Sequence, residues 1–563
     1  MSERGASSGP WWAVVAIGLA ACVVVEGALA GAPVGEGTVD AIGTWWFQWW
    51  VADTLSTGSS FLYTDQLFFP FGKDVLAHTG ANVLDALLVA PVRLALGPVA
   101  AWNLLVAAVV ATNGLAAGLV ARRGGALAGV LGAILGGLHP YVLHELGQGR
   151  PTQAIVAPLL GALVLGDTGL RRGGIGRLVA AGALLALQGW FYWFAGLFGA
   201  LALAVLGAGA VWDARPRGVV SAGRLLVALG VAAALAAPVA GPLAVSAARG
   251  EASGLIDVSR WLADGTTVTR EGDFVRLTVL GAAGEAGVLD RGGFLPDGPI
   301  LGLGVLLLAA LAPWRWRIVG LLALLFAFGP SIGGVTNPVY VAVAALCPPL
   351  ARLWWPVRAL SLLVPVAAVG LAALGRARRT DAPGQFAAAL RRVPTAALGI
   401  GLAVVLGGEV VARGLLPFGT WQPRVPEGVA VLAESPKGAA IVLPWGYDQT
   451  PLLYQTTTGV PLFNGMYERT AAFVPDALRA LQRENGFVSA LMVVPVDPRA
   501  VTPYTEAEKA AFVALGYRWV VLRRAATGPP DGARARGVLR RLTQMLGAPR
   551  VQDADVYVWD LAG

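Results

Sequence analysis

Long apolar runs separated by short polar turns dominate the first 416 residues of the chain. Many of these runs approach the roughly 20 apolar residues that cross a bilayer. They predict membrane-spanning helices over residues 11–31, 99–121, 124–143, 151–168, 177–190, 191–212, 223–247, 299–313, 317–330, 356–376 and 394–416. Arginines gather in every second turn, as the positive-inside rule expects of cytoplasmic turns. The pattern therefore predicts eleven spans, with the N-terminus in the cytoplasm and the C-terminus outside.

Two further apolar stretches, residues 83–97 and 337–350, do not fit this alternation. Prolines interrupt both of them, so each is either an interfacial or a re-entrant segment, or an additional crossing. If both cross, the number of spans becomes thirteen. Two long loops, near residues 32–81 and 248–298, are then expected on the outer side.

The hydrophobic pattern changes at Gly419. Short β-type runs are found at residues 439–444, 518–522 and 555–560, and helical periodicity at 473–483, 506–515 and 538–546. This alternation predicts an α/β domain. The expected fold is thus an α-helical polytopic membrane protein with about 11–13 transmembrane helices in residues 1–418, followed by a soluble extracytoplasmic α/β domain in residues 419–563.

Composition supports this assignment. The chain has 563 residues, of which 56% are hydrophobic and only 13% charged, which excludes an ordinary soluble protein. The net charge of +8 could indicate nucleic acid, but the arginines cluster at the ends of apolar runs, so we expect them to face lipid headgroups and expect no nucleic-acid partner. The two cysteines lie in apolar runs and suggest neither a disulfide framework nor a cysteine metal site.

The first outer loop holds an acidic residue beside a dense aromatic segment. Asp40 lies about ten residues beyond the first predicted span and just ahead of Trp45, Trp46, Trp49 and Trp50. Because tryptophan favours the headgroup level, we expect this segment to lie along the outer membrane surface. The Asp40 carboxylate could approach a hydroxyl group there. A solvated loop acid beside a membrane anchor is the alternative.

The same loop continues with a Phe-Phe-Pro-Phe-Gly turn at residues 68–72, followed by Lys73, Asp74 and His78. Lys73 could contact a phosphate group. A structural turn with an exposed lysine explains the segment equally well.

Two outward-facing arginines are further candidates for binding an anion. Arg150 follows a polar patch that includes His139, His144 and Glu145, and it breaks the positive-inside trend. The patch could bind a divalent ion, but its spacing matches no metal motif, so a polar hairpin is the other interpretation. Arg358 begins a predicted span at the outer side, where a cation must contact an anion or reach the headgroups.

The early aspartate, the "FFPFG" turn, the many spans and the C-terminal α/β domain together resemble the GT-C superfamily, which comprises multi-pass glycosyltransferases that use polyprenyl-phosphate sugars. The resemblance implies that Asp40 is the catalytic base. It implies that Arg358, and also Arg150 and Lys73, hold the lipid-linked phosphate. Asp74 and His78, which follow Lys73 in the same loop, are further substrate-binding candidates. The chain has Val39 in place of a second acid, which leaves a divalent metal open and no metal ligand assigned.

The resemblance also implies the partners and the reaction. A sugar would move from a polyprenyl-phosphate donor, on the outer face of the cytoplasmic membrane, to a glycan, lipid or protein acceptor. A non-enzymatic transporter or assembly protein for envelope polysaccharide or lipid is the alternative. A transporter should show paired helix interruptions or a mid-span ionisable residue, and the nearest candidate, Glu26, lies late in the first span. An enzyme should place Asp40 and Arg358 in one outward cavity.

Overall fold

The computed structural model describes residues 10–75, 83–214, 218–248, 302–329, 331–332, 335–347, 350, 356–379, 392–412, 414–434, 438–446, 448–466, 474–527 and 532–562. Two parts of the sequence-based interpretation fall outside these residues. They are the candidate His78 and nearly all of the predicted outer loop at 248–298.

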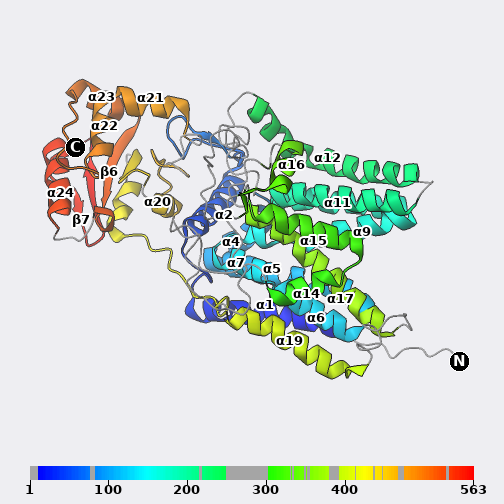
Figure 1. The fold of residues 1–563 in the computed structure, drawn as a ribbon. Helices are drawn as coiled ribbons and strands as arrows, with labels where there is room; N and C mark the ends of the chain where they lie inside the picture. Colours follow the sequence, from blue (N-terminus) through cyan, green and yellow to red (C-terminus); the bar gives the residue numbers. More distant parts are fainter. Residues whose placement is uncertain are drawn as a thin grey trace.

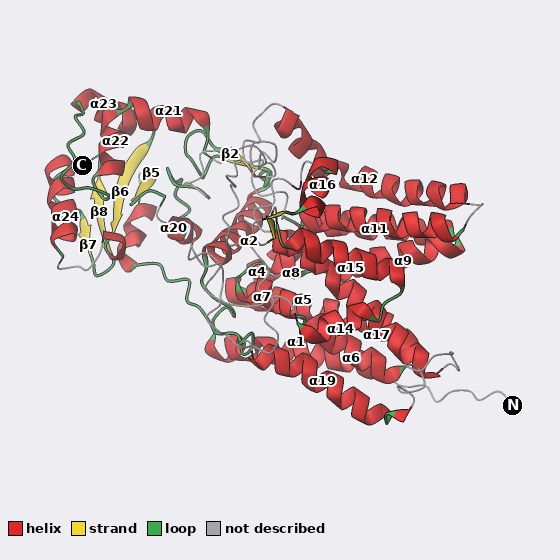
Figure 2. Ribbon diagram, in the orientation of Figure 1, coloured by secondary structure: helices red, strands yellow, loops and turns green. Residues whose placement is uncertain are grey.

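Eight helical segments within the described residues are long and apolar enough to cross a membrane. They are Trp11–Ala30, Pro98–Gly124, Ala126–Gly147, Pro151–Arg172, Trp193–Asp213, Gly218–Gly241, Pro356–Arg379 and Thr395–Ala412. Figures 1 and 2 show the long helices of this part of the chain lying side by side as a bundle. The chain is therefore a polytopic helical membrane protein, as its hydrophobic pattern predicts.

The helices of the membrane part follow one another closely in sequence. They are α1 (Trp11–Ala30), α2 (Val39–Thr57), α4 (Leu84–Leu96), α5 (Pro98–Ala121), η1 (Arg122–Gly124), α6 (Ala126–Gly137), α7 (Pro140–Gly147), α8 (Pro151–Ala154), α9 (Ala157–Arg172), α10 (Ile175–Phe191), α11 (Trp193–Asp213), α12 (Gly218–Ala248), α14 (Leu303–Ala310), α15 (Trp314–Ala327), α16 (Pro338–Leu346), η4 (Pro356–Leu362), α17 (Leu363–Arg379) and α19 (Thr395–Ala412). Two short hairpins, β1 (Tyr63–Thr64) with β2 (Lys73–Asp74) and β3 (Ser331–Ile332) with β4 (Val335–Thr336), interrupt them.

Four of the apolar runs form shorter helices than a full crossing needs, and a fifth, the expected span near 177–190, contains α10, whose 17 residues are at the lower limit. The expected spans near 299–313 and 317–330 contain α14 and α15. The ambiguous stretches 83–97 and 337–350 contain α4 and α16. At 1.5 Å per residue, the nine residues of α16 rise about 14 Å, well short of the roughly 30 Å hydrocarbon core. The thirteen residues of α4 rise about 20 Å, so neither α4 nor α16 is long enough to cross alone.

The aromatic segment of the first loop forms the helix α2. Thr38 caps its N-terminus, because its side chain accepts a hydrogen bond from the Ala41 amide, and Asp40 lies in the first turn. An acid in that position interacts favourably with the positive end of the helix dipole. Gly58 ends the helix in the left-handed conformation, with φ 71°. Helix α2 packs along α4 and against the C-terminal region.

The C-terminal region forms a four-stranded mixed sheet with helices around it, as Figure 2 shows. Its elements are η5 (Glu427–Ala433), β5 (Ala439–Leu443), α20 (Thr450–Thr458), α21 (Asp476–Glu484), α22 (Gly486–Val493), α23 (Glu506–Ala514), β6 (Tyr517–Arg523), η7 (Ala525–Thr527), α24 (Ala533–Leu546), β7 (Val551–Gln552) and β8 (Val556–Asp560). The strand order is β5-β6-β8-β7, with β5 and β6 parallel and the other pairs antiparallel. The buried strands β5, β6 and β8 are those that the sequence predicts.

The Phe-Phe-Pro-Phe-Gly turn docks against this sheet. Residues 461–464 lie beside β5, where Phe463 N donates to Ala440 O at 2.8 Å. Residues 66–69 lie on the other side of that segment, where Phe69 N donates to Leu462 O at 2.9 Å. The Phe68 side chain is fully buried and stands where a Cβ of Gly465 would lie. The first loop thus adds an extended segment to the edge of the C-terminal sheet.

Candidate functional site

The N-terminus of α2 is fixed to the turn between α7 and α8. Thr38 Oγ1 donates to Gln148 O at 2.7 Å, and Thr44 Oγ1 donates to Gly149 O at 3.0 Å. Gly149 has φ 73°, and a Cβ at this position would lie 2.3 Å from the Ala41 Cβ, so only glycine permits the close approach. These contacts hold Asp40 beside the α7–α8 turn.

Arg150 occupies this turn and contacts Asp40 directly. Arg150 Nη1 lies 3.2 Å from Asp40 Oδ2, and Arg150 Nε lies 2.5 Å from Glu145 Oε2. The Glu145 side chain is buried and the Arg150 side chain is largely covered, whereas 30% of the Asp40 side chain is exposed. The guanidinium thus joins two carboxylates through charge-assisted contacts, which fix its orientation. Asp40 is therefore both positioned and accessible.

His144 completes the polar surroundings of Arg150. The His144 Nε2 atom lies 3.2 Å from Arg150 Nη2. The short helix α7 that carries His144 and Glu145 begins with Pro140, and His139 accepts a hydrogen bond from the Tyr141 amide at the helix start. Adjacent residues of α7, His144 and Glu145, thus both contact the Arg150 guanidinium.

Two buried amides stabilise the chain just after Arg150. Between α8 and α9, Asn113 Oδ1 accepts from the amides of Val156 and Ala157, and Gln188 Nε2 donates to Ile155 O. A break in a membrane helix frees backbone groups that must be satisfied inside the protein. Asn113 and Gln188 satisfy them, and the α8 segment is thereby fixed to α5 and α10.

Arg358 belongs to the same electrostatic network. It lies in η4, which packs against α7, and it interacts electrostatically with Glu145 and Asp40. Its Nη1 donates to the Tyr192 hydroxyl at 3.1 Å, and its guanidinium lies 5.7 Å from the centre of the Tyr192 ring. Within the described part of the chain, no carboxylate lies within salt-bridge distance of Arg358. That Asp40 and Arg358 border one outward cavity stays a prediction.

The other candidates lie on the hairpin of the first loop. Lys73 and Asp74 form β2, where Lys73 Nζ lies 5.3 Å from the centre of the Phe68 ring and Asp74 is exposed. This hairpin belongs to the segment that docks against the C-terminal sheet, whereas Asp40 contacts the α7–α8 turn. The structure thus joins Asp40, Arg150 and Arg358, and it gives Lys73 and Asp74 a separate place.

The tryptophans of α2 face the protein instead of the membrane surface. Trp45, Trp46 and Trp50 are buried, and Trp45 packs edge-on against Trp421 at 5.5 Å between ring centres. The Trp46 indole donates to Gln455 Oε1 at 2.6 Å. The expectation of an interfacial anchor is therefore wrong for these three rings, because partners from distant parts of the chain cover them.

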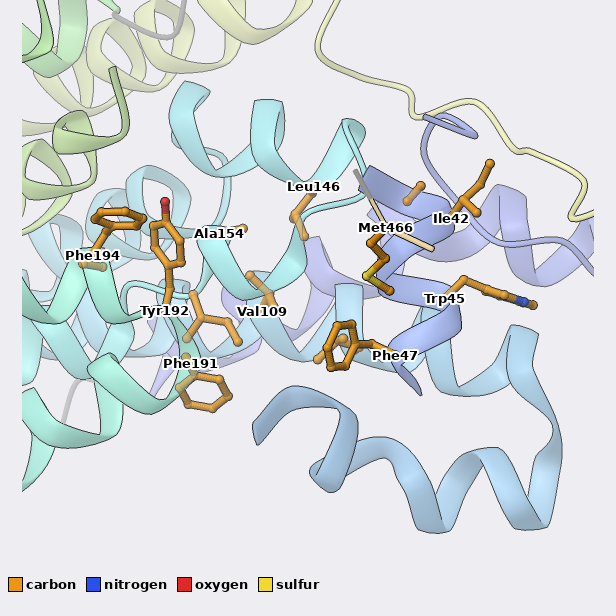
Figure 3. Close-up of a cluster of buried hydrophobic side chains, with 14 of the residues drawn as sticks. Ile42, Trp45, Phe47, Val109, Leu146, Ala154, Phe191, Tyr192, Phe194 and Met466 are labelled. Carbon is orange, nitrogen blue, oxygen red and sulfur yellow. The ribbon is translucent and has the colours of Figure 1, made fainter. Parts of the chain in front are cut away.

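Figure 3 shows how this packing reaches across the site. Ile42, Trp45 and Phe47 of α2 belong to one cluster of buried side chains that includes Met466 of the C-terminal region and extends to Tyr192. The sequence did not single out Tyr192, because it is one phenol between two apolar runs. Its place at the break between α10 and α11 is the feature that could have marked it as a candidate.

The side chains around Asp40 do not fit a metal ion. Within the described residues, no group of three His, Cys, Asp or Glu side chains could hold one. Asp40 and Glu145 both contact the Arg150 guanidinium, which competes with any cation for their oxygens.

No protein-family model matches the sequence, and no curated protein matches it either. Solved structures do match. The arabinofuranosyltransferase AftD from Mycobacteria aligns over 100% of this chain and 42% of its own, with 15% identity and a TM-score of 0.54. The present chain therefore spans less than half the length of that protein.

The oligosaccharyltransferase AglB from Archaeoglobus fulgidus, in complex with an inhibitory peptide and a dolichol-phosphate, is a weaker match. It aligns over 94% of this chain and 71% of its own, with 14% identity and a TM-score of 0.44. The mycobacterial protein is a member of the GT-C superfamily. Its likeness shows the fold of the chain and confirms the fold that the sequence resemblance implies.

Proposed function

We propose that this chain is a membrane glycosyltransferase of the GT-C type, which moves a sugar from a polyprenyl-phosphate donor to an acceptor. The observation that carries the proposal is the network around Asp40. An accessible carboxylate is held by a largely covered arginine, and a second arginine without a carboxylate partner within the described residues lies in the same network. The shared fold of a membrane arabinofuranosyltransferase supports it.

Asp40 acts as the general base. The acceptor hydroxyl attacks the anomeric carbon of the donor sugar while Asp40 takes the hydroxyl proton. The bond between that carbon and the phosphate oxygen breaks, and the polyprenyl phosphate leaves with the bonding electrons. The exposure of Asp40 at the N-terminus of α2 allows an acceptor to reach its carboxylate.

Arg358 stabilises the departing phosphate. Its planar guanidinium can make two parallel hydrogen bonds to phosphate oxygens, and such preorganised donors act where charge develops. The hydrogen bond to the Tyr192 hydroxyl fixes the guanidinium from one side. Tyr192 is thus a positioning residue.

Arg150 is also a positioning residue in this mechanism. Two carboxylates already contact its guanidinium, so its charge is largely compensated and it is less suited than Arg358 to bind the donor phosphate. Its contribution is to hold the Asp40 carboxylate in one orientation against the α7–α8 turn. Lys73 and Asp74, on the docked hairpin, remain candidates for contacts with more distant parts of the substrate.

We place the reaction on the outer face of the cytoplasmic membrane. Arginines lie where α5, α9 and α17 end, at Arg122-Arg123, Arg171-Arg172 and the last residues of α17. Turns rich in arginine stay in the cytoplasm. The N-terminus is then cytoplasmic. Residues 1–418 form the transmembrane domain, and residues 419–563 form a domain on the outer side, next to the helix that carries Asp40.

Transfer of labelled sugar from short polyprenyl-phosphate donors tests the proposal. The purified protein in lipid nanodiscs is incubated with pentose and hexose donors, beginning with arabinofuranose because of the shared fold, and with alkyl glycoside acceptors. Wild type should transfer one of these sugars, and Asp40→Asn should lower the rate by about 10²–10⁴-fold.

Asp53→Asn is the matched control, because Asp53 is an exposed aspartate on the same helix. It should keep the wild-type rate. Equal rates for Asp40→Asn and wild type, with both proteins folded, would remove Asp40 from the mechanism. No transfer by the wild type from any donor would overturn the proposed activity.

A further inference from the structure

The loop after β5 brings the C-terminal region to the helix that carries Asp40. Strand β5 ends at Leu443, and the chain reaches α20 through residues 444–449. Ligands of sheets with parallel strands commonly bind beyond the carboxyl ends of those strands, and β5 and β6 are parallel. Helix α20, which begins directly after this loop, packs against α2.

Gln449 in this loop has an unusual side chain. The residue is 4% exposed, and neither Nε2 nor Oε1 of its amide has a hydrogen-bond partner in the described part of the chain. It holds the N-cap position of α20, yet its side chain makes no capping bond. Buried amides are almost always satisfied, because an unpaired one costs free energy.

Gln455, six residues further along the chain, is a glutamine whose amide has a structural role. Its Oε1 accepts from the Trp46 indole, and its Nε2 donates to Gln66 O and Val460 O. Both polar atoms of that amide are hydrogen-bonded, and they join α20 to α2 and to the first loop. The Gln449 amide, at the same junction, makes no hydrogen bond within the described residues.

The position of Gln449 relative to α2 points to its partner. A Cβ built on Gly43 would lie 2.9 Å from Gln449 Oε1, so the amide rests directly on the helix at Gly43. Gly43 follows Asp40 by three residues, and residues three apart are neighbours on one helix face, about 5–6 Å apart. The unpaired amide therefore contacts α2 about one helical turn after Asp40.

We propose that the Gln449 amide binds a hydroxyl group of a carbohydrate acceptor and presents the neighbouring hydroxyl to Asp40. This inference rests on the proposed function and names the acceptor class and a residue that selects it. A primary amide offers a donor and an acceptor side by side, as adjacent sugar hydroxyls do. The Trp445 indole nitrogen, in the same loop, is also buried without a partner in the described residues and supplies a further donor.

The assignment makes sense of the glycine at position 43. A helix interior disfavours glycine by roughly 1 kcal/mol relative to alanine. Here the missing side chain leaves the space that the Gln449 amide occupies. Glycine at position 43 thus lowers the local helix stability and leaves room for a polar group of the C-terminal region one turn after Asp40.

Replacing Gln449 by leucine tests the inference. Removal of an unpaired buried amide should leave stability unchanged or raise it. Loss of one or two hydrogen bonds to the acceptor should raise the KM for an octyl glycoside acceptor by about tenfold. The KM for the polyprenyl-phosphate sugar should not change, because Gln449 does not contact the donor.

Gln48→Leu is the matched control. Gln48 is also fully buried with both amide atoms unpaired in the described residues, and it lies on the same helix α2. Its substitution should leave the acceptor KM at the wild-type value. If both leucine variants raise the acceptor KM equally, the effect is a general one of helix packing, and the inference is wrong.

Gly43→Ala tests the same site from the other side. The new Cβ must displace the Gln449 amide, while the helix itself gains stability. A rise in acceptor KM at unchanged or higher thermal stability supports the inference. An unchanged acceptor KM in both Gln449→Leu and Gly43→Ala, in protein that transfers sugar normally, overturns it and leaves the proposed function intact. Absence of transfer in the wild type would instead overturn both.

Discussion

Trp46 donates its indole N–H to Gln455 Oε1 at 2.6 Å, although 409 residues separate the two in the sequence. The bond joins α2, the helix that carries Asp40, to α20. Helix α20 begins directly after the loop that holds Gln449. Both side chains are buried. The helix with the candidate base is therefore held by membrane helices on one side and by the C-terminal region on the other.

We expect Trp46→Phe to destabilise the protein, because it leaves Gln455 Oε1 buried without a donor. The cost should be about 1–3 kcal/mol, seen as a lower unfolding temperature in detergent. Trp49→Phe is the control, because Trp49 lies on the same helix, is half-buried and makes no described hydrogen bond through its indole. Its effect should be clearly smaller. Equal effects would show that ring volume, and not the hydrogen bond, matters.

We expect Arg358→Lys to weaken the binding of the donor. Lysine keeps the charge but loses the planar pair of N–H groups that matches a phosphate. The KM for the polyprenyl-phosphate sugar should rise by about tenfold or more, with the acceptor KM unchanged. Arg317→Lys, at an exposed position in α15, is the control and should behave as wild type. A wild-type donor KM in Arg358→Lys would separate this arginine from the phosphate.

Tyr192→Phe should reproduce part of that effect. The substitution removes the hydroxyl that accepts from Arg358 Nη1 and keeps the ring on which the guanidinium lies. We expect the donor KM to rise about fivefold, because the Arg358 guanidinium loses its hydrogen bond to the Tyr192 hydroxyl. The double variant Arg358→Lys with Tyr192→Phe should be no worse than Arg358→Lys alone. Additive losses would mean that the two residues act independently.

Stability should fall as the pH rises from about 4 to about 7, because of Asp85. Burial at the start of α4 raises the pKa of the Asp85 carboxyl from 3.8 to about 7. Below pH 4 the carboxyl is protonated in the folded and the unfolded protein, so it has no effect. Between these pKa values only the unfolded chain ionises, and the folded state therefore loses up to about 4 kcal/mol of relative stability.

Asp85→Asn removes this titration and should make the unfolding temperature higher than that of wild type at pH 8 and nearly equal to it at pH 4. The unfolding temperature measured between these values in detergent provides the test. A wild-type profile that rises with pH over this range, and a variant with the same slope, would show that Asp85 does not control it.

The sequence predicted those features that local pattern determines. Runs of buried apolar residues predicted β5, β6 and β8 within one or two residues, and arginine-bounded apolar runs predicted the long helices. The helix α2 was harder, because four tryptophans in six residues are also typical of a membrane-surface anchor. Their partners, Trp421 and Gln455, come from the far end of the chain. Only the tertiary structure brings them together.

The site shows the same division. Asp40 was a candidate because it precedes a dense aromatic segment in the first loop. Arg150 breaks the positive-inside trend, and Arg358 begins an apolar run on the predicted outer side, where a cation is costly unless it contacts an anion or the headgroups. Nothing local links Arg150 to Asp40, or Tyr192 to Arg358, because 110 and 166 residues separate these pairs. Gln449 was invisible for a different reason: an unpaired amide is defined by the contacts that it lacks, and those exist only in the folded protein.

The extended segment at residues 66–69 has a consequence for how the chain matures. It borders the C-terminal sheet through residues 461–464, which the ribosome makes almost four hundred residues later. The edge formed by residues 66–69 therefore stays uncovered until the C-terminal region has been synthesised. A nascent chain stopped before residue 460 would lack the segment that pairs with residues 66–69.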